Sequence, residues 1–221
     1  MSFQTFFPTL VYHAALSSGA RSSASSKTAT HARLLKELHR ESLTIRDVDH
    51  EGQEWSKENY SSSFSQGFTS YGSWDQLHRS SPTFGELEKQ IDRHVAKFAR
   101  RQNWDLRGGC LQMSSCWVNV MPAGAAHSLH LHPLSVVSGT FYVAVPKGAS
   151  PIKFEDPRLD RFMAQPPRSP KAPLAMQPFV ALKPRQGDLI LFESWLRHEV
   201  PPLKPGVRGE RISVSFNYDW V

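Results

Sequence analysis

The sequence predicts an α+β fold in which helices come first and a β-barrel or jelly roll follows. Residues 82–101 carry apolar side chains at helical spacing, whereas short apolar segments separated by Pro and Gly fill the chain after Gly109. Within these later segments polar and apolar residues alternate with a period of two, as they do in strands. We therefore expect helices packed outside a C-terminal β core.

The N-terminal part is expected to hold one helix between two irregular segments. Residues 17–30 are small and polar and predict a loop, and residues 31–43 place three leucines on one side of a helix. Residues 45–81 are rich in Ser, Gly and aromatic residues and show no clear period. A long irregular stretch of this kind is typical of a binding surface or of a cover over the core.

The segment 82–101 is the strongest helix prediction. Thr83 and Glu86 have the spacing of a capping box, and Pro82 suits the start of a helix. The apolar stripe of this helix consists of Phe84, Leu87, Ile91, Val95 and Phe98. Basic residues near its C-terminal end complement the helix dipole.

Six segments with Pro or Gly at their borders predict strands: 113–121, 139–145, 151–157, 179–182, 187–194 and 211–218. In the last segment the apolar face holds Ile212, Val214 and Phe216, and the polar face holds Arg211, Ser213, Ser215 and Asn217. In the first segment Trp117 and Asn119 lie opposite an apolar face in the same way. Such alternation is ordinary for a sheet with one face in water, and the alternative is that several polar faces line one cavity.

Composition and charge narrow the class of protein. The formal charge of +6 over 221 residues is a mild, dispersed excess that does not favour a nucleic-acid partner. The chain has no apolar run of about eighteen residues, and its N-terminus lacks the basic region of a signal peptide. Cys110 and Cys116 lie too far apart along a strand to bridge, which predicts free thiols and a reducing, cytoplasmic location. Nothing in the composition indicates an oligomeric state.

The stretch "HSLHLHP" at 127–133 suggests a metal site. An extended backbone projects His130 and His132 in the same direction, and Pro133 ends the strand there. Two neutral imidazoles that converge can begin a site for Fe, Zn or Cu. His198, which follows the apolar strand 187–194, is the candidate for a third ligand.

The segment 117–218 resembles the iron- and 2-oxoglutarate-dependent oxygenases, whose core is a double-stranded β-helix. It is most similar to a bacterial-type branch with an H-x-H-P…S-G-x-[FY]-Y signature, which here is "HLHP" at 130–133 and "SGTFY" at 138–142. "FEDPR", "GDLILFESWLRHEVPP" and "RISVSFNY" also resemble this branch. The resemblance implies a single oxygenase domain over 1–221, with a helical or irregular part at 1–108 and the β-helix core at 109–221.

One position departs from the pattern of the wider superfamily, which uses His-x-Asp or His-x-Glu and a distal His. Here His132 occupies the carboxylate position. We expect a set of three histidines (His130, His132 and His198), with His127 beside the metal or as an alternative ligand. A carboxylate could substitute instead, and the candidates are Asp156, Asp188 and Glu193.

The resemblance also implies cosubstrate residues. Arg211 and Ser213 are similar to the Arg-x-Ser pair that holds the distal carboxylate of 2-oxoglutarate in related enzymes, with Arg208 as the competitor for Arg211. Asn119 and Tyr142 are expected as additional hydrogen-bond donors, and Trp117 as a wall of the pocket. No catalytic residue is expected beyond the metal site.

The implied activity is a dioxygenase reaction with Fe(II), 2-oxoglutarate and O₂ that hydroxylates a C–H bond of a small-molecule or peptide substrate. Asp156 and Arg158 are candidates for substrate contact, and residues 45–81 for selectivity. Two alternatives remain open at this stage. One is a cupin-like metal enzyme that does not use 2-oxoglutarate, and the other is a non-enzymatic binding module that uses the aromatic stretch 55–74.

Overall fold

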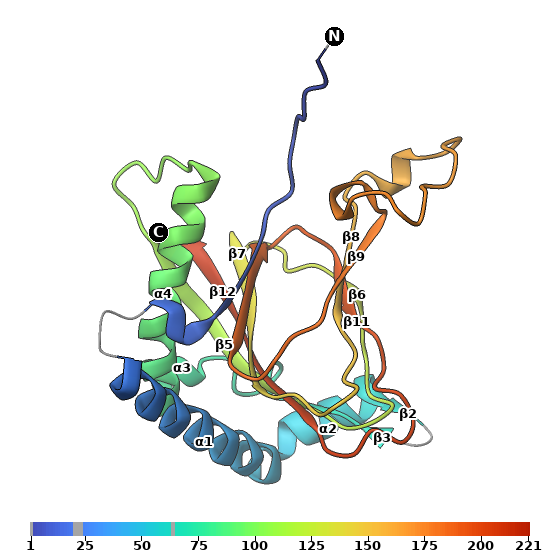
Figure 1. The fold of residues 1–221 in the computed structure, drawn as a ribbon. Helices are drawn as coiled ribbons and strands as arrows, with labels where there is room; N and C mark the ends of the chain where they lie inside the picture. Colours follow the sequence, from blue (N-terminus) through green and yellow to red (C-terminus); the bar gives the residue numbers. More distant parts are fainter. Residues whose placement is uncertain (1, 20–23, 63–64) are drawn as a thin grey trace.

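Two β-sheets face each other, and helices cover the outer face of the larger sheet (Figure 1). The structure is a computed structural model that describes residues 2–19, 24–62 and 65–221. The helices are α1 (Ala24–Val48), α2 (His50–Tyr60), α3 (Leu77–Ser80) and α4 (Pro82–Gln102). The strands of the larger sheet are β1 (Val11–Ala15), β4 (Phe68–Thr69), β5 (Leu111–Met121), β7 (Val137–Ala144), β10 (Asp188–Glu193) and β12 (Arg211–Trp220). The smaller sheet contains β6 (His127–His130), β8 (Ile152–Glu155), β9 (Phe179–Leu182) and β11 (His198–Val200), and β2 (Ser61–Ser62) pairs with β3 (Ser65–Gln66).

The strand order explains how distant segments meet. The larger sheet runs β1-β10-β7-β12-β5-β4 and the smaller one β6-β11-β8-β9, with every pair antiparallel. This architecture confirms the predicted α+β fold with a jelly-roll core and helices outside. The N-terminal part also supplies strands, because β1 and β4 extend the larger sheet on its two sides.

The period of two in the predicted strands is borne out on β12. Ile212, Val214 and Phe216 are buried in the core between the larger sheet and the helices. The same core takes the apolar stripe of α4 and two leucines of α1, Leu34 and Leu38. All six predicted strands form, with bounds that shift by a few residues. The six predicted segments did not include β1 and β11, which are only 5 and 3 residues long and carry no clear alternation, whereas β6 matches the extended backbone predicted before Pro133.

The N-terminal predictions need correction. The helix predicted at 31–43 spans Ala24–Val48, so most of the predicted loop at 17–30 is helical, apart from 20–23, which lie outside the described residues. The segment 45–81, predicted as irregular, contains α2, α3 and three short strands. Polar helices of this kind owe their stability to packing on the rest of the protein more than to their own residue preferences.

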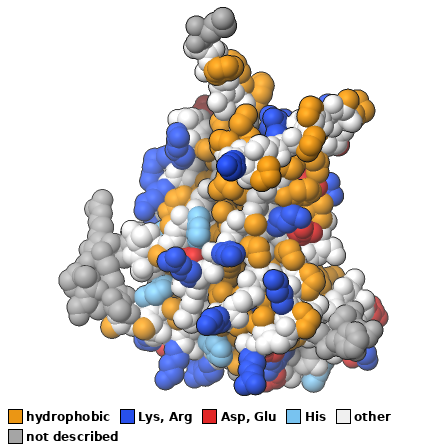
Figure 2. Space-filling view, turned by 45° about the vertical axis from the view of Figure 1, so that its right-hand side comes forward, with side chains coloured by type: hydrophobic (Ala, Val, Ile, Leu, Met, Phe, Trp, Pro, Cys, Tyr) orange, Lys and Arg blue, Asp and Glu red, His pale blue; other side chains and the backbone are white. Residues whose placement is uncertain are grey.

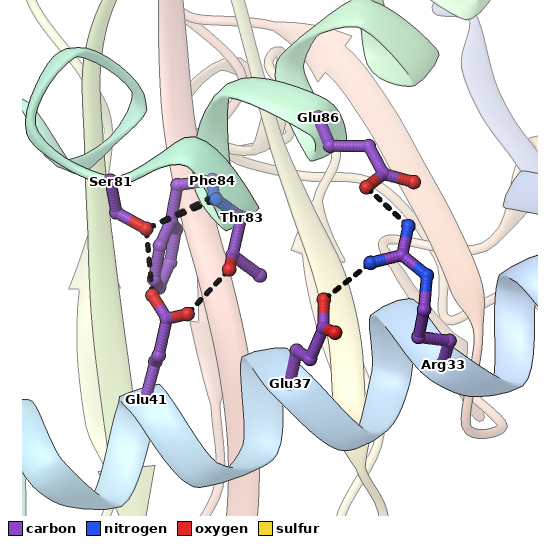
Figure 3. Close-up of polar contacts among 7 residues, drawn as sticks. All are labelled: Arg33, Glu37, Glu41, Ser81, Thr83, Phe84 and Glu86. Carbon is purple, nitrogen blue, oxygen red and sulfur yellow. Dashed lines mark hydrogen bonds and ion pairs between the residues drawn. The ribbon is translucent and has the colours of Figure 1, made fainter.

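The start of α4 corrects a second prediction. The helix begins at Pro82, so Ser81 is its cap, and the Ser81 hydroxyl accepts hydrogen bonds from the backbone N–H groups of Thr83 and Phe84. Both the Ser81 hydroxyl, at 2.6 Å, and the Thr83 hydroxyl donate to the Glu41 carboxylate on α1 (Figure 3). Glu86 does not close a capping box but pairs with Arg33 of α1 at 2.6 Å (Figure 3). These contacts join α1 to the first turn of α4.

Two expectations about location can be compared with the fold. Cys110 is exposed and Cys116 is buried, and both are free thiols as predicted. Over the described part of the chain, no helix combines the length and the apolar composition that crossing a membrane requires.

Candidate metal centre

A cavity of about 300 Å³ lies between the two sheets. Its walls are formed by the polar faces of β5, β7 and β12, by β6 and β11 opposite them, and by residues near α2 and β4. The residues that line it are Trp55, Tyr60, Thr69, Tyr71, Trp117, Asn119, His127, His130, Leu131, His132, Pro133, Gly139, Thr140, Tyr142, Ile152, Phe192, His198, Val200, Arg211, Ser213, Ser215 and Asn217. Of the two explanations for the alternating strands, the second is therefore correct: their polar faces line a single cavity and do not face bulk water.

Three histidines meet in this cavity. His130 and His198 are cross-strand partners on β6 and β11, and their ring centroids lie 4.3 Å apart. His132 follows the end of β6, where its backbone N–H donates to the carbonyl of Ser194 at 2.9 Å. One nitrogen from each of the three rings lies within 4.8 Å of the others, a spacing that can hold a metal ion. His127 is not part of this group.

Hydrogen bonds leave the same nitrogen of each ring available. His130 Nδ1 donates to the carbonyl of Ser128 at 2.7 Å, and His198 Nδ1 donates to the carbonyl of Leu196 at 3.0 Å. His132 Nδ1 lies 2.8 Å from the amide oxygen of Asn217. Since a carbonyl can only accept, Nδ1 carries the hydrogen and Nε2 keeps its lone pair, which is the form that binds a metal. His132 Nε2 is buried and has no partner among the described residues.

Burial keeps two of these rings neutral. Burial, helped by the neighbouring His130, lowers the pKa of His198 to about 3 and the pKa of His132 to about 4. At neutral pH these rings therefore carry no proton that a metal would have to displace. The residues fit a metal ion of the kind that imidazole binds, and they would hold it through three Nε2 atoms.

The other end of the cavity holds a single buried cation. Arg211 is 2 % exposed, and its Nη1 has no hydrogen-bond partner among the described residues. Burial lowers the pKa of its guanidinium, which nevertheless stays charged as arginine does in proteins. A buried charge without a counter-ion is costly, so this end of the cavity is suited to an anion.

The strand register sets the other predicted cosubstrate residues beside Arg211. Ser213 of β12 lies opposite Asn119 of β5 on one side and opposite Tyr142 of β7 on the other, so the three form one row across the sheet. Burial raises the pKa of Tyr142 to about 12, so its hydroxyl keeps its proton and can donate. The Asn119 amide donates to the Ser215 hydroxyl at 3.0 Å, and its oxygen has no partner among the described residues.

Comparisons with known proteins agree with this geometry. Residues 115–217 match the model of a family described as "Putative 2OG-Fe(II) oxygenase". The matched segment, a little under half of the chain, is therefore similar to the 2OG-Fe(II) oxygenase family. No curated protein sequence matches this chain.

Two solved structures of low identity share the fold of this chain, and a third aligns with only part of it. The non-heme alpha ketoglutarate dependent epimerase SnoN from nogalamycin biosynthesis aligns with a TM-score of 0.59 at 13 % identity, over 96 % of this chain and 77 % of SnoN. A Pseudomonas putida prolyl-4-hydroxylase aligns with a TM-score of 0.54 at 16 % identity, over 96 % and 92 % of the two chains. A 2OG-Fe(II) oxygenase family oxidoreductase from Burkholderia pseudomallei aligns with a TM-score of 0.42 at 17 % identity, over 57 % of this chain and about half, 52 %, of that one.

Several residues that were predicted for the site lie elsewhere in the structure. Asp156 and Arg158 pair with each other at 2.8 Å and border a separate surface groove instead of the cavity. None of the described residues that line the cavity is Asp or Glu, so neither Asp188 nor Glu193 replaces His132 there. Arg208 is exposed and does not line the cavity.

Sequence reasoning missed two groups of residues around the site. The first is a chain of hydrogen bonds behind His132: the Ser138 hydroxyl donates to Asn217 at 2.8 Å and lies 2.8 Å from the Ser194 hydroxyl. The polar face of β12 was the signal for Asn217, but its partner could not be read from the sequence. The second group is aromatic, namely Trp55, Tyr60 and Tyr71. The segment 45–81 was expected to contribute to selectivity, but these three residues were not singled out in it.

Proposed function

We propose that the chain is an Fe(II)- and 2-oxoglutarate-dependent dioxygenase that hydroxylates a C–H bond of a small-molecule or peptide substrate. The single observation that carries this proposal is the joint placement of three imidazoles and the unpaired, buried Arg211 in one cavity. An iron ion held by the imidazoles would supply O₂ activation coupled to oxidation of 2-oxoglutarate. The family match supports this class of reaction.

Other side chains of the cavity are suited to bind the cosubstrate and to exclude water. Arg211 is suited to grip the distal carboxylate of the cosubstrate with two parallel hydrogen bonds, while the Ser213 and Tyr142 hydroxyls add donors on the same wall. Trp117 is 5 % exposed and stacks on His132 with ring centroids 5.8 Å apart. Its indole shields the metal side of the cavity from water, which favours controlled oxidation of a bound substrate.

A metal site of three histidines differs in charge from the usual site of two histidines and one carboxylate. Replacing the usual carboxylate by the neutral His132 leaves the metal site with one more positive charge. The dianionic cosubstrate offsets part of this charge, and no carboxylate among the described lining residues does so. We therefore expect binding of the cosubstrate to depend strongly on electrostatics and to weaken as salt increases.

An anaerobic titration tests the proposal. Metal-free protein is titrated with Fe(II), with and without 2-oxoglutarate, and a weak visible charge-transfer band is expected only when both are present. Arg211→Met should abolish the band at moderate cosubstrate concentrations, whereas Arg208→Met, the matched control on an exposed loop, should keep it. On admission of O₂, succinate should form, and a hydroxylated product should gain one oxygen atom in its mass spectrum.

Three outcomes would contradict the proposal. Failure to bind any metal would favour a non-enzymatic module. Metal binding with no response to Arg211→Met would favour a metal enzyme that does not use 2-oxoglutarate. Succinate formation with a product that lacks added oxygen would retain the cosubstrate but replace hydroxylation by another oxidation.

A further inference from the structure

A fourth histidine lines the same cavity and has no role in the metal group. His127 is the first residue of β6, and its ring centroid lies 6.3 Å from that of His130. Along β11 it is the partner of Val200, whereas His130 is the partner of His198, so it lies further along the strand than the metal group. Its Nε2 atom is buried and has no hydrogen-bond partner among the described residues.

The orphaned nitrogen of His127 belongs to the same region as Arg211. Both residues line the cavity, and each holds a buried nitrogen without a hydrogen-bond partner among the described residues, Nε2 of His127 and Nη1 of Arg211. Burial lowers the pKa of His127 well below its usual value, and the positive charge of Arg211 lowers it further. His127 is therefore a neutral imidazole, which carries a single N–H. With that hydrogen on Nε2, both unpartnered nitrogens are donors, and a ligand that brings acceptors to both satisfies them.

The N-terminal part of the chain holds the His127 ring in place. Tyr60, the last residue of α2, packs on it with ring centroids 5.0 Å apart and an angle of 31° between the rings. Trp55, which lies earlier on α2, packs on Tyr60 with ring centroids 5.5 Å apart. A ring fixed by such packing can direct its nitrogen without losing much rotational freedom when a ligand binds.

We propose that His127 donates a hydrogen bond from Nε2 to the distal carboxylate of 2-oxoglutarate, beside Arg211, and so makes the pocket selective for 2-oxo acids with two carboxylates. The inference rests on the proposed function. A carboxylate accepts several hydrogen bonds at once, so the guanidinium and the imidazole can bind it together. Tyr60 acts as a positioning residue for this contact.

The experiment compares two cosubstrate probes on the Fe(II)-loaded protein without O₂. 2-Oxoglutarate has the distal carboxylate, and 2-oxopentanoate has the same chain length but lacks it. Dissociation constants are measured from the charge-transfer band and by calorimetry. His127→Leu should weaken 2-oxoglutarate binding about 10- to 100-fold, as expected for loss of a hydrogen bond to a charged group, and should leave 2-oxopentanoate binding unchanged.

Further variants separate the possible explanations. His127→Gln keeps an N–H donor of similar reach and should recover part of the affinity, while Tyr60→Leu should reproduce a smaller part of the loss. Fe(II) affinity without cosubstrate should be unchanged in all three. A weakened Fe(II) affinity in His127→Leu would overturn the inference in favour of a ligand role, and equal losses for both probes would overturn it in favour of a purely structural role.

The inference and the proposed function can fail separately. If Arg211→Met removes discrimination between the two probes but His127→Leu does not, only the role of His127 is wrong. If neither variant affects 2-oxoglutarate binding, the proposed function itself is wrong.

Discussion

Nδ1 of His132 lies 2.8 Å from Oδ1 of Asn217, so a residue of the central strand β12 orients a histidine that stands beyond the end of β6. Asn217 is 7 % exposed and is itself fixed by the Ser138 hydroxyl. The larger sheet thus controls which tautomer and which direction the His132 ring adopts. Replacing partners that orient a ligand in this way typically lowers metal affinity about 10- to 100-fold.

Asn217→Ala should weaken metal binding. Without the acceptor, the His132 ring loses both its orientation and its preference for the tautomer with a free Nε2, so we expect metal affinity to fall about 10- to 100-fold. Isothermal titration with Fe(II) or Mn(II) in the absence of cosubstrate measures the change. Asn119→Ala removes an amide from the same wall but touches none of the three histidines, and it should leave metal affinity unaltered. Equal affinities for the Asn217 variant and the parent protein would rule out this role.

Stability of the metal-free protein should fall as the pH is lowered from about 6.5 toward 4. In the unfolded chain His132 and His198 take up protons near pH 6.5, whereas in the fold burial lowers the pKa of His132 to about 4 and that of His198 to about 3. Above this range both states are neutral and the two rings add no pH dependence. Within it the unfolded state binds more protons, so the free energy of unfolding should decrease by up to about 1.4 kcal/mol per pH unit for each ring.

Urea unfolding of the metal-free protein at several pH values measures this slope. His198→Leu and His132→Leu should each flatten it, because each removes one titrating ring. A slope that stays the same in both variants would show that other groups cause the acid sensitivity. Saturating metal should protect the parent protein at neutral pH more than at acidic pH, since protons compete for the same nitrogens.

Gly139→Ala should destabilise the protein. A Cβ atom at this position would lie 2.5 Å from the Phe216 ring and 2.7 Å from the backbone oxygen of Ile190, and the backbone cannot yield easily. Overpacking of this kind costs about 1–3 kcal/mol, which thermal or urea unfolding can detect. Thr140→Ala alters the neighbouring residue on the cavity face and serves as the control, with a smaller expected effect. The glycine of the "SGTFY" motif is thus explained by packing of Phe216 against β7, and an unchanged stability of Gly139→Ala would contradict this.

Ser81→Ala should weaken the junction between α1 and α4. The variant removes the cap of α4 and one of the two hydroxyls that donate to Glu41 (Figure 3), so we expect a loss of about 1–2 kcal/mol in the free energy of unfolding. Ser81→Asp restores a capping oxygen but sets a negative charge against Glu41, and it should recover only part of the loss. Arg33→Ala removes a more exposed contact between the same helices and should change stability little. A Ser81→Ala variant as stable as the parent would mean that the contacts to Glu41 and the helix cap add nothing.

The sequence was most informative where neighbouring residues act together. The alternation on β12 correctly predicted which side chains enter the core but left open whether the opposite face meets water or a cavity, and the spacing of His130 and His132 correctly predicted that both rings would point to one place. The cap at Ser81 was missed because Thr83 and Glu86 had the more familiar spacing, although Pro82 already marked the first residue of the helix. The capping-box spacing thus pointed to Thr83, two positions after the actual cap.

Contacts between distant segments could not be read from the pattern. Tyr60 lies near His127 only because α2 packs beside β4, which itself pairs with β5. Serine and glycine around these aromatic residues hide any helical period, so the segment 45–81 seemed irregular. The roles of Asn217 toward His132 and of Glu41 toward Ser81 likewise depend on register and helix packing over long separations.

The placement of β1 and β4 limits how the chain can be divided. β1 pairs with the outer edge of β10 and β4 pairs with the outer edge of β5, so backbone hydrogen bonds cover both edges. A fragment that starts at residue 109 would leave both borders bare, strip the helices from the apolar face of the sheet and remove Tyr60 from beside His127. Such a fragment contains every predicted metal ligand, yet its uncovered strands would favour self-association over a working pocket. The first half of the protein is therefore an integral part of the fold and not a detachable appendage.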